Sequence, residues 1–309
     1  MENRGAGLSA TADTAGAPGL FFDAELLKKL ERLHLVAKRL NWGGLKGEHA
    51  AVRKGHSLEF SDYRRYQRGD DLRYVDWNVY RRLERLLLKV FTAEQEMNVY
   101  LLVDTSLSMA EGRPAKIDYA RHVAAALGYI ALKNLDRVGG ASFSSRLQAK
   151  LSMGRGRRQI LGLFDFLARL SCDGRTDFLD AVKSFGALFA QPGLVVVVSD
   201  LMDPAGCRAG LEELCRRGHQ LLVVHILDPD ELHPMAAGEV TLLDVEQPRE
   251  RRTFIDAELV RLFEQELARY LAEIEAVCAG WKIDYVRTTT HVAFDEFVLQ
   301  MLRRTRSVT

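Results

Sequence analysis

The residues of this chain that could carry chemistry begin with one carboxylate and two hydroxyls that follow an apolar run. The segment Val99-Tyr-Leu-Leu-Val-Asp104-Thr-Ser106-Leu-Ser108 starts with the apolar, β-branched character of a buried parallel strand and ends in oxygen-bearing side chains at alternate positions. A tight turn after the strand would bring Asp104, Ser106 and Ser108 to one point. A carboxylate and two hydroxyls are hard oxygen ligands, so this pattern predicts a site for a small divalent cation, Mg²⁺ or else Mn²⁺.

Two later segments offer further ligands of the same kind. Residues 193–200 form a second apolar run that ends in Asp200, and Thr176 lies in the turn formed by residues 173–177. In an open α/β sheet, ligands bind outside the carboxyl ends of the strands. We therefore predict a metal site made of Asp104, Ser106, Ser108, Thr176 and Asp200. The two serines would bind the cation directly, Thr176 directly or through water, and the two aspartates would hold metal-bound water and orient the shell.

A simpler interpretation competes with this one, because serine and aspartate are also common helix caps and turn residues. Ser106 and Ser108 alone fit that role, and we expect Asp177 and Asp203 to be N-caps. The order of the three segments, two of them at the ends of apolar strands, favours the metal site. Such a partly neutralised cation retains affinity for an anionic oxygen, which an Asp or Glu of a partner protein would supply.

The elements that must position these residues follow an alternating pattern. Apolar runs predict strands at about 99–104, 137–143, 193–200, 220–227 and 283–287, with an edge strand at 146–151. Helical patterns lie at about 114–134, 156–170, 177–190, 205–217, 256–279 and 291–304, and a β-hairpin is expected within 240–255. This alternation predicts an α/β fold with a doubly wound, mostly parallel sheet over residues 97–304.

The chain before residue 97 is expected to contain three parts. Residues 1–22 are rich in Gly, Ala, Ser and Thr and are predicted to be disordered. An amphipathic helix from Asp23 to about Leu40 is expected to dock on the sheet domain, with a partner-binding arm as the alternative. We group this helix with the following segment as a region spanning residues 23–96.

Residues 55–90 combine aromatic side chains with charges of both signs. Bidentate pairing between Arg and carboxylate groups is directional, so we expect a network of such pairs to fix this segment onto the sheet domain. A partner-docking surface and nucleic-acid binding are the alternatives. The near balance of acids and bases disfavours nucleic acid, because phosphate binding depends on an excess of positive charge.

Two parts of the sequence resemble known protein families. The set Asp104-x-Ser106-x-Ser108, Thr176 and Asp200 resembles the metal-ion-dependent adhesion site of von Willebrand factor type A domains, which have a Rossmann-like fold. The preceding segment resembles the signature of the bacterial domain of unknown function 58 family, with the matching residues Glu59, Phe60, Asp62, Arg64, Tyr66, Gly69, Asp70, Asp71, Arg73, Asp76 and Trp77. The likeness runs from about Gly47 nearly to the C-terminus.

The resemblance implies a functional context. Such proteins are typically encoded beside MoxR-type AAA+ ATPases, which are thought to act as chaperones in the maturation of enzyme complexes, so it implies an adaptor between ATPase and client. In one respect the chain departs from the pattern. Leu201-Met202-Asp203 stands where many adhesion-type domains have a glycine, which argues against an integrin-like switch between open and closed states.

The composition limits the binding partners and the cellular compartments that we expect for this protein. The formal net charge of +1 gives no general attraction to nucleic acid or to anionic membranes. We find no apolar run of about 18–20 residues, as a membrane span requires, and no signal-peptide pattern at the N-terminus. The four cysteines include no Cys-x-x-Cys pair. We therefore expect a cytoplasmic protein without a membrane span.

These observations together predict a non-enzymatic, cation-dependent protein–protein interaction module with no catalytic residues. A metal-dependent phosphatase or other hydrolase is the alternative, with Asp104 as nucleophile or metal ligand. Phosphatases of the haloacid dehalogenase type carry a second aspartate two residues later as the general acid. Here that position is Ser106, which cannot act as an acid near neutral pH.

Overall fold

The computed structural model describes residues 23–39, 58–68, 70–93, 96–203, 205–232, 238–243 and 250–304. The chain divides into two compact units. Within the described ranges, the sheet unit comprises residues 23–39 and 98–304, and the signature unit comprises residues 58–97. The prediction of disorder for residues 1–22 lies outside the described residues.

The sheet unit is built on six strands in the order β10-β7-β6-β3-β4-β5. Their bounds are β3 (Asn98–Asp104), β4 (Arg137–Phe143), β5 (Leu147–Gly154), β6 (Leu194–Ser199), β7 (Gln220–Leu227) and β10 (Asp284–Thr289). Neighbouring strands are parallel throughout, except that the edge strand β5 runs antiparallel to β4. The predicted fold class, an α/β fold with a doubly wound and mostly parallel sheet, is therefore confirmed.

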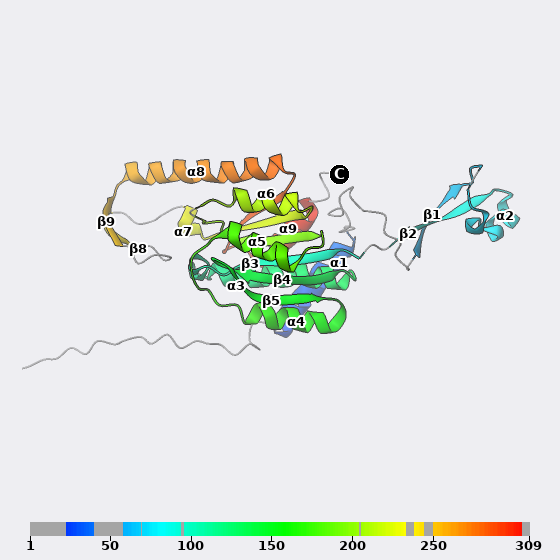
Figure 1. Ribbon diagram of the computed structural model, residues 1–309, viewed down its shortest axis with the longest axis horizontal. Coiled ribbons are helices and arrows are strands. Elements are labelled where there is room, and N and C mark those ends of the chain that lie inside the picture. Colours follow the sequence, from blue (N-terminus) through cyan, green and yellow to red (C-terminus); the bar gives the residue numbers. More distant parts are fainter. Residues whose placement is uncertain are drawn as a thin grey trace, which may run out of the picture. The chain divides into compact units, whose positions relative to one another are not determined.

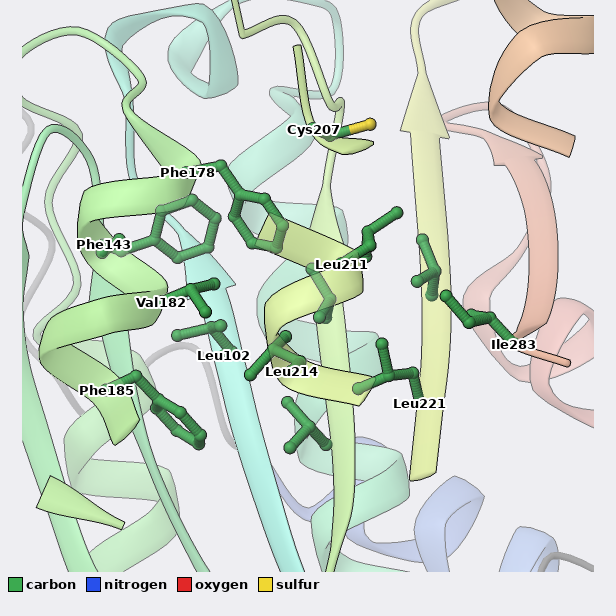
Figure 2. Packing of buried hydrophobic residues seen from close by; sticks show 14 of the residues in the cluster. Leu102, Phe143, Phe178, Val182, Phe185, Cys207, Leu211, Leu214, Leu221 and Ile283 are labelled. Carbon is green, nitrogen blue, oxygen red and sulfur yellow. The ribbon is translucent and has the colours of Figure 1, made fainter. Parts of the chain in front are cut away.

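Helices cover both faces of this sheet, as a sheet made of apolar strands requires. Leu102, Phe143 and Val197 belong to a core with side chains of α5 (Phe178–Leu188), α6 (Arg208–Arg216) and α8 (Ala257–Gly280). Figure 2 shows Phe178, Val182 and Phe185 of α5 facing Leu211 and Leu214 of α6 above the strands. The aromatic and branched side chains of this layer give the core its tight packing.

The opposite face is covered first by α3 (Lys116–Lys133), which contacts β3, β4, β6 and β7. Fifteen of its 18 residues are buried, because α4 (Gly156–Ala168), α1 (Ala24–Arg39) and α9 (Phe294–Arg304) pack against it from outside (Figure 1). Its run of alanines allows this close packing. Pro114, which we predicted inside this helix, precedes it, since α3 begins at Lys116.

Helix α1 docks on the sheet unit through one apolar stripe. Leu26, Leu30, Leu33 and Ala37 are buried, and the helix contacts both α3 and α9. Although we grouped residues 23–96 as one region by their order in the chain, α1 clusters with the sheet unit. The helix has an apolar stripe that fits α3 and α9, whereas the signature unit pairs its own strands.

Two small hairpins complete the described elements. In the sheet unit, β8 (Gly238–Leu243) pairs antiparallel with β9 (Glu250–Ile255), as expected. In the signature unit, β1 (Leu58–Arg65) pairs antiparallel with β2 (Leu87–Ala93), and the short helices η2 (Leu72–Tyr74) and α2 (Trp77–Leu83) lie between them. Within the described ranges, no helix combines the length and apolar character that a membrane crossing requires.

Candidate metal centre

The carboxyl ends of β3 and β6 lie side by side at the centre of the sheet. The two strands are parallel neighbours in a register that pairs Val103 with Val198, so Asp104 and Ser199 end next to each other and Asp200 follows. From β3 the chain continues to β4 on one side, while β6 lies on the other. Such a change of direction is where open α/β sheets bind ligands.

Asp104 is completely buried and is held by two short hydrogen bonds. The backbone N–H of Ser106 donates to Oδ1 at 2.9 Å, and the hydroxyl of Ser199 donates to Oδ2 at 2.6 Å. The Ser199 hydroxyl in turn accepts from the N–H of Leu201 at 2.8 Å. Each carboxylate oxygen has a second lone pair, so these bonds orient Asp104 without exhausting its capacity to accept.

The hydroxyls of Ser106 and Ser108 face each other at an Oγ–Oγ distance of 3.1 Å. Ser106 has the backbone conformation of an N-cap of the short helix η3 (Leu107–Ala110), yet its side chain makes no capping hydrogen bond. The capping interpretation therefore does not explain the buried hydroxyl of Ser106. Two hydroxyl oxygens beside a buried carboxylate are the donors that a hard cation prefers.

The loop that contains Thr176 is bonded to the loop that follows β3. The N–H of Leu107 donates to the carbonyl of Gly174 at 3.0 Å, and the N–H of Asp173 donates to the carbonyl of Thr105 at 2.8 Å. Thr176 is 5% exposed. The structure thus brings the segments of all five predicted ligands to one edge of the sheet.

Asp200 is also completely buried, and its main partner is a residue that we did not predict. Oδ1 accepts from the N–H of Met202 at 3.1 Å, and Oδ2 accepts from the Nζ of Lys116 at 2.7 Å. The same Nζ contacts Oε1 of Glu231, on the short helix α7 (Pro229–Leu232) after β7. One sequence signal could have revealed Lys116. A cationic side chain at the first residue of a helix interacts unfavourably with the positive end of the helix dipole, so it needs a compensating partner.

The backbone of Asp200 is fixed by a buried histidine from β7. The Nε2 of His225 lies 2.9 Å from the carbonyl oxygen of Asp200, and its Nδ1 lies 2.7 Å from the hydroxyl of Tyr285. Burial lowers the pKa of His225 to about 4, so the ring is neutral at physiological pH. In addition, the hydroxyl of Tyr270 on α8 donates to the carbonyl of Leu201.

The electrostatics at this edge favour a bound cation. Burial, and next the negative charge of Asp200, raise the pKa of Asp104 to about 7, against the opposing effect of its hydrogen bonds. Burial acts to lower the pKa of Lys116, but the charges of Asp200 and Glu231 outweigh it and raise that pKa. Lys116 compensates the charge of Asp200, whereas the hydrogen bonds of Asp104 come from uncharged groups, so the donor set fits an additional hard divalent ion.

We expected both Asp177 and Asp203 to be N-caps; this is confirmed for Asp177 on α5 but is wrong for Asp203, because Cys207 holds the N-cap position of α6. Oδ1 of Asp177 accepts from the N–H of Asp180 at 3.0 Å and caps α5. Oδ2 of Asp203 accepts from the N–H of Phe178 at 2.9 Å, so it ties the loop after β6 to the start of the same helix. Across the described ranges, no three or more His, Cys, Asp or Glu side chains are grouped to hold a metal, so the candidate depends on hydroxyl ligands.

In the signature unit, two described arginines pair with aspartates of the same segment. Arg64 forms a bidentate pair with Asp70 at 2.7 and 2.6 Å, and Arg73 pairs with Asp71. Asp76 caps α2 and accepts from the hydroxyl of Tyr63 at 2.8 Å. The side chains of Glu59, Phe60 and Asp62, and the whole of Gly69, lie outside the described residues. The expected docking of this segment through such pairs stays a prediction.

Comparison with known proteins gives one family match and several similar chains. The model of the family described as "Protein of unknown function DUF58" matches residues 62–271. An uncharacterized protein of Mycobacterium tuberculosis is 27% identical over 263 residues, which make up 84% of this chain and 83% of that protein.

Two solved structures show a weaker likeness. The conserved hypothetical protein BatB from Bacteroides thetaiotaomicron has a TM-score of 0.41 at 14% identity, over 68% of this chain and 99% of that one. The pilus adhesin SpaC from Lactobacillus rhamnosus GG, in its open conformation, has a TM-score of 0.45 at 11% identity, over 70% of this chain and 31% of that one.

Proposed function

Because the chain belongs to the DUF58 family and gathers acidic and hydroxyl side chains at the carboxyl ends of β3 and β6, we propose that it is a cation-dependent protein–protein interaction module. In this proposal Mg²⁺, or Mn²⁺ in its place, binds at Asp104, Ser106, Ser108, Thr176 and Asp200. The protein is not an enzyme. It acts in the cytoplasm as an adaptor between a MoxR-type AAA+ ATPase and a client protein, which supplies an acidic residue.

One observation carries this proposal. Two fully buried carboxylates, Asp104 and Asp200, lie at the ends of adjacent strands, next to a pair of serine hydroxyls that is not used for capping. Buried carboxylates are costly unless paired, and the raised pKa of Asp104 reflects that cost. A cation at this edge relieves the cost, and it offers a carboxylate of a partner a directional contact that a small surface can use for specificity.

The metal is tested first, by titrating the full chain with Mn²⁺ and with Mg²⁺ in a calorimeter. We expect the double variant Ser106→Ala/Ser108→Ala to lose at least about tenfold in affinity, because it removes both hydroxyl ligands and leaves the carboxylates in place. Ser152→Ala is the matched control, since Ser152 is an exposed serine of the edge strand β5. Equal binding by the double variant and the control would disprove the site.

The partner is tested with the purified MoxR-type ATPase of the same organism. We expect the two proteins to bind in the presence of Mg²⁺, and binding to be lost with a chelator or with the double serine variant. Addition of an acidic peptide should compete with the client if the client supplies a carboxylate. Binding that is unchanged by the chelator would contradict the proposed mode of interaction.

A further inference from the structure

Lys116 places a positive charge at the candidate metal centre itself. Its side chain is fully buried, and its Nζ lies 2.7 Å from Oδ2 of Asp200 and also contacts Glu231. Asp200 belongs to the loop after β6, whereas Glu231 belongs to α7 after β7. One ammonium group therefore joins the ends of two neighbouring strands to the start of α3.

This position is unfavourable for a lysine on general grounds. A buried ammonium loses its hydration, and at the first residue of α3 it also lies at the positive end of the helix dipole. Ala115, at the N-cap, makes no side-chain hydrogen bond that would offset this. Only the two carboxylates compensate for these costs, so Lys116 and Asp200 depend on each other in the fold.

We propose that Lys116 is an internal counter-ion of the metal centre, which neutralises Asp200 when no cation is bound and thereby weakens the binding of a divalent cation. This inference rests on the proposed function, because it concerns the same site. Lys116 is a positioning residue in this account: it acts on the cation through Asp200. A site of this kind stays folded when empty and holds its cation more strongly once a partner adds a further carboxylate.

Glu231 competes with Asp200 for the ammonium group of Lys116. Its Oε1 shares the Nζ of Lys116, while its Oε2 accepts from the N–H of Asp228 at 2.7 Å. The Glu231 side chain is 27% exposed, in contrast to the fully buried Lys116 and Asp200. Removing its charge would leave the ammonium to Asp200 alone and weaken cation binding, so Glu231 and Lys116 have opposite effects on the cation.

The test measures Mn²⁺ affinity by calorimetry in the full chain. We expect Lys116→Met to bind Mn²⁺ at least about tenfold more tightly, because one unit charge within several ångströms acts strongly at a partly buried site. We expect Glu231→Gln, which keeps the hydrogen-bonding shape, to bind several-fold more weakly. Lys133→Met is the control, since Lys133 lies exposed at the other end of the same helix.

Thermal unfolding in a chelator gives a second readout that needs no bound metal. There Lys116→Met should melt at a lower temperature than Lys133→Met, because Asp200 and Glu231 then lack their counter-ion. Unchanged or weaker Mn²⁺ binding by Lys116→Met would overturn the inference.

Two further outcomes keep the test decisive. If Lys116→Met does not fold, Glu231→Gln decides, and equal or tighter Mn²⁺ binding by that variant overturns the inference. If the wild type binds Mn²⁺ through its serines but neither charge variant alters the affinity, only the counter-ion role fails. If neither the wild type nor any variant binds Mn²⁺, the proposed function fails and this inference fails with it.

Discussion

At the scale of single residues, Asp104 combines full burial with only partial compensation of its charge. Its hydrogen bonds, among them those from the Ser106 backbone and the Ser199 hydroxyl, come from uncharged donors. Burial and the nearby Asp200 raise its pKa above the value it has in an unfolded chain. A carboxyl whose folded pKa is raised makes the fold less stable as pH rises from the unfolded to the folded value, because over that range the group ionises in the unfolded chain while the buried group keeps its proton.

We therefore predict that Asp104→Asn stabilises the metal-free protein at pH 8. The amide keeps an acceptor for the Ser106 N–H and removes the buried charge, which should add at least about 1 kcal/mol and raise the Tm by about 2–4 °C. With excess Mg²⁺ the order should reverse, since only the wild type gains from binding. Scanning calorimetry in chelator and in excess Mg²⁺ measures the Tm of the variant and of the wild type under each condition. A variant that is less stable than the wild type in chelator would contradict the prediction.

Part of this residue-scale picture could be predicted from the sequence. Asp104, Ser106, Ser108 and Asp200 stand out because polar side chains end apolar strands, and strand adjacency then brings them together. Lys116 could not be placed in the same way. Its partners are 84 and 115 residues away along the chain, and only the three-dimensional arrangement of α3, β6 and β7 brings them together.

At the scale of elements, the site depends on how closely the central strands approach. β4 has glycine at position 140, where an added Cβ would lie 2.2 Å from the backbone carbonyl oxygen of Leu101 on β3. A backbone atom within a sheet cannot move aside as the end of a flexible side chain can. The spacing of β3 and β4, and with it the position of Asp104, therefore requires this glycine.

We predict that Gly140→Ala destabilises the sheet unit by several kcal/mol, because the new methyl group must separate two paired strands. The matched control is Gly162→Ala in α4, where the nearest atom to an added Cβ is 3.8 Å away. That change should be neutral or stabilising by up to about 1 kcal/mol, since alanine favours helices over glycine. Urea unfolding of both variants measures the difference, and similar effects of the two would refute it.

Most elements of the sheet unit were predictable, because long apolar runs and helical periodicity are strong local signals. The strand order was not, since it depends on which strands pair across the fold. The partners of α1 were not predictable for a related reason: its apolar stripe indicates that the helix docks, but not on which helices, and here it packs on α3 and α9.

At the scale of the whole molecule, folding free energy should respond to the buried histidines. Burial lowers the pKa of His225 to about 4, and burial also lowers the pKa of His219. A histidine with a depressed folded pKa contributes stability that is present above its unfolded value of 6.5 and is lost as pH falls toward the folded value. Acid should therefore weaken the fold as the pH falls from about 6.5 toward 4.

We predict that His225 alone accounts for a loss of about 2–3 kcal/mol between pH 7.5 and pH 4.5. His225→Gln, which cannot titrate, should show a correspondingly shallower pH profile, whatever its stability at neutral pH. Urea unfolding of both proteins in chelator at steps of one pH unit measures this. The influence of Asp104 is common to both proteins, so parallel profiles would count against the prediction.

The packing of α1 on α3 and α9 has a consequence for biosynthesis. Among the described helices α1 leaves the ribosome first and α9 last, yet each helps to bury the other, because α1 and α9 are in contact. The apolar stripe of α1 must therefore stay partly uncovered until α9 has been translated. During that interval the nascent protein presents an exposed apolar helix face, which makes it a natural client for holding chaperones.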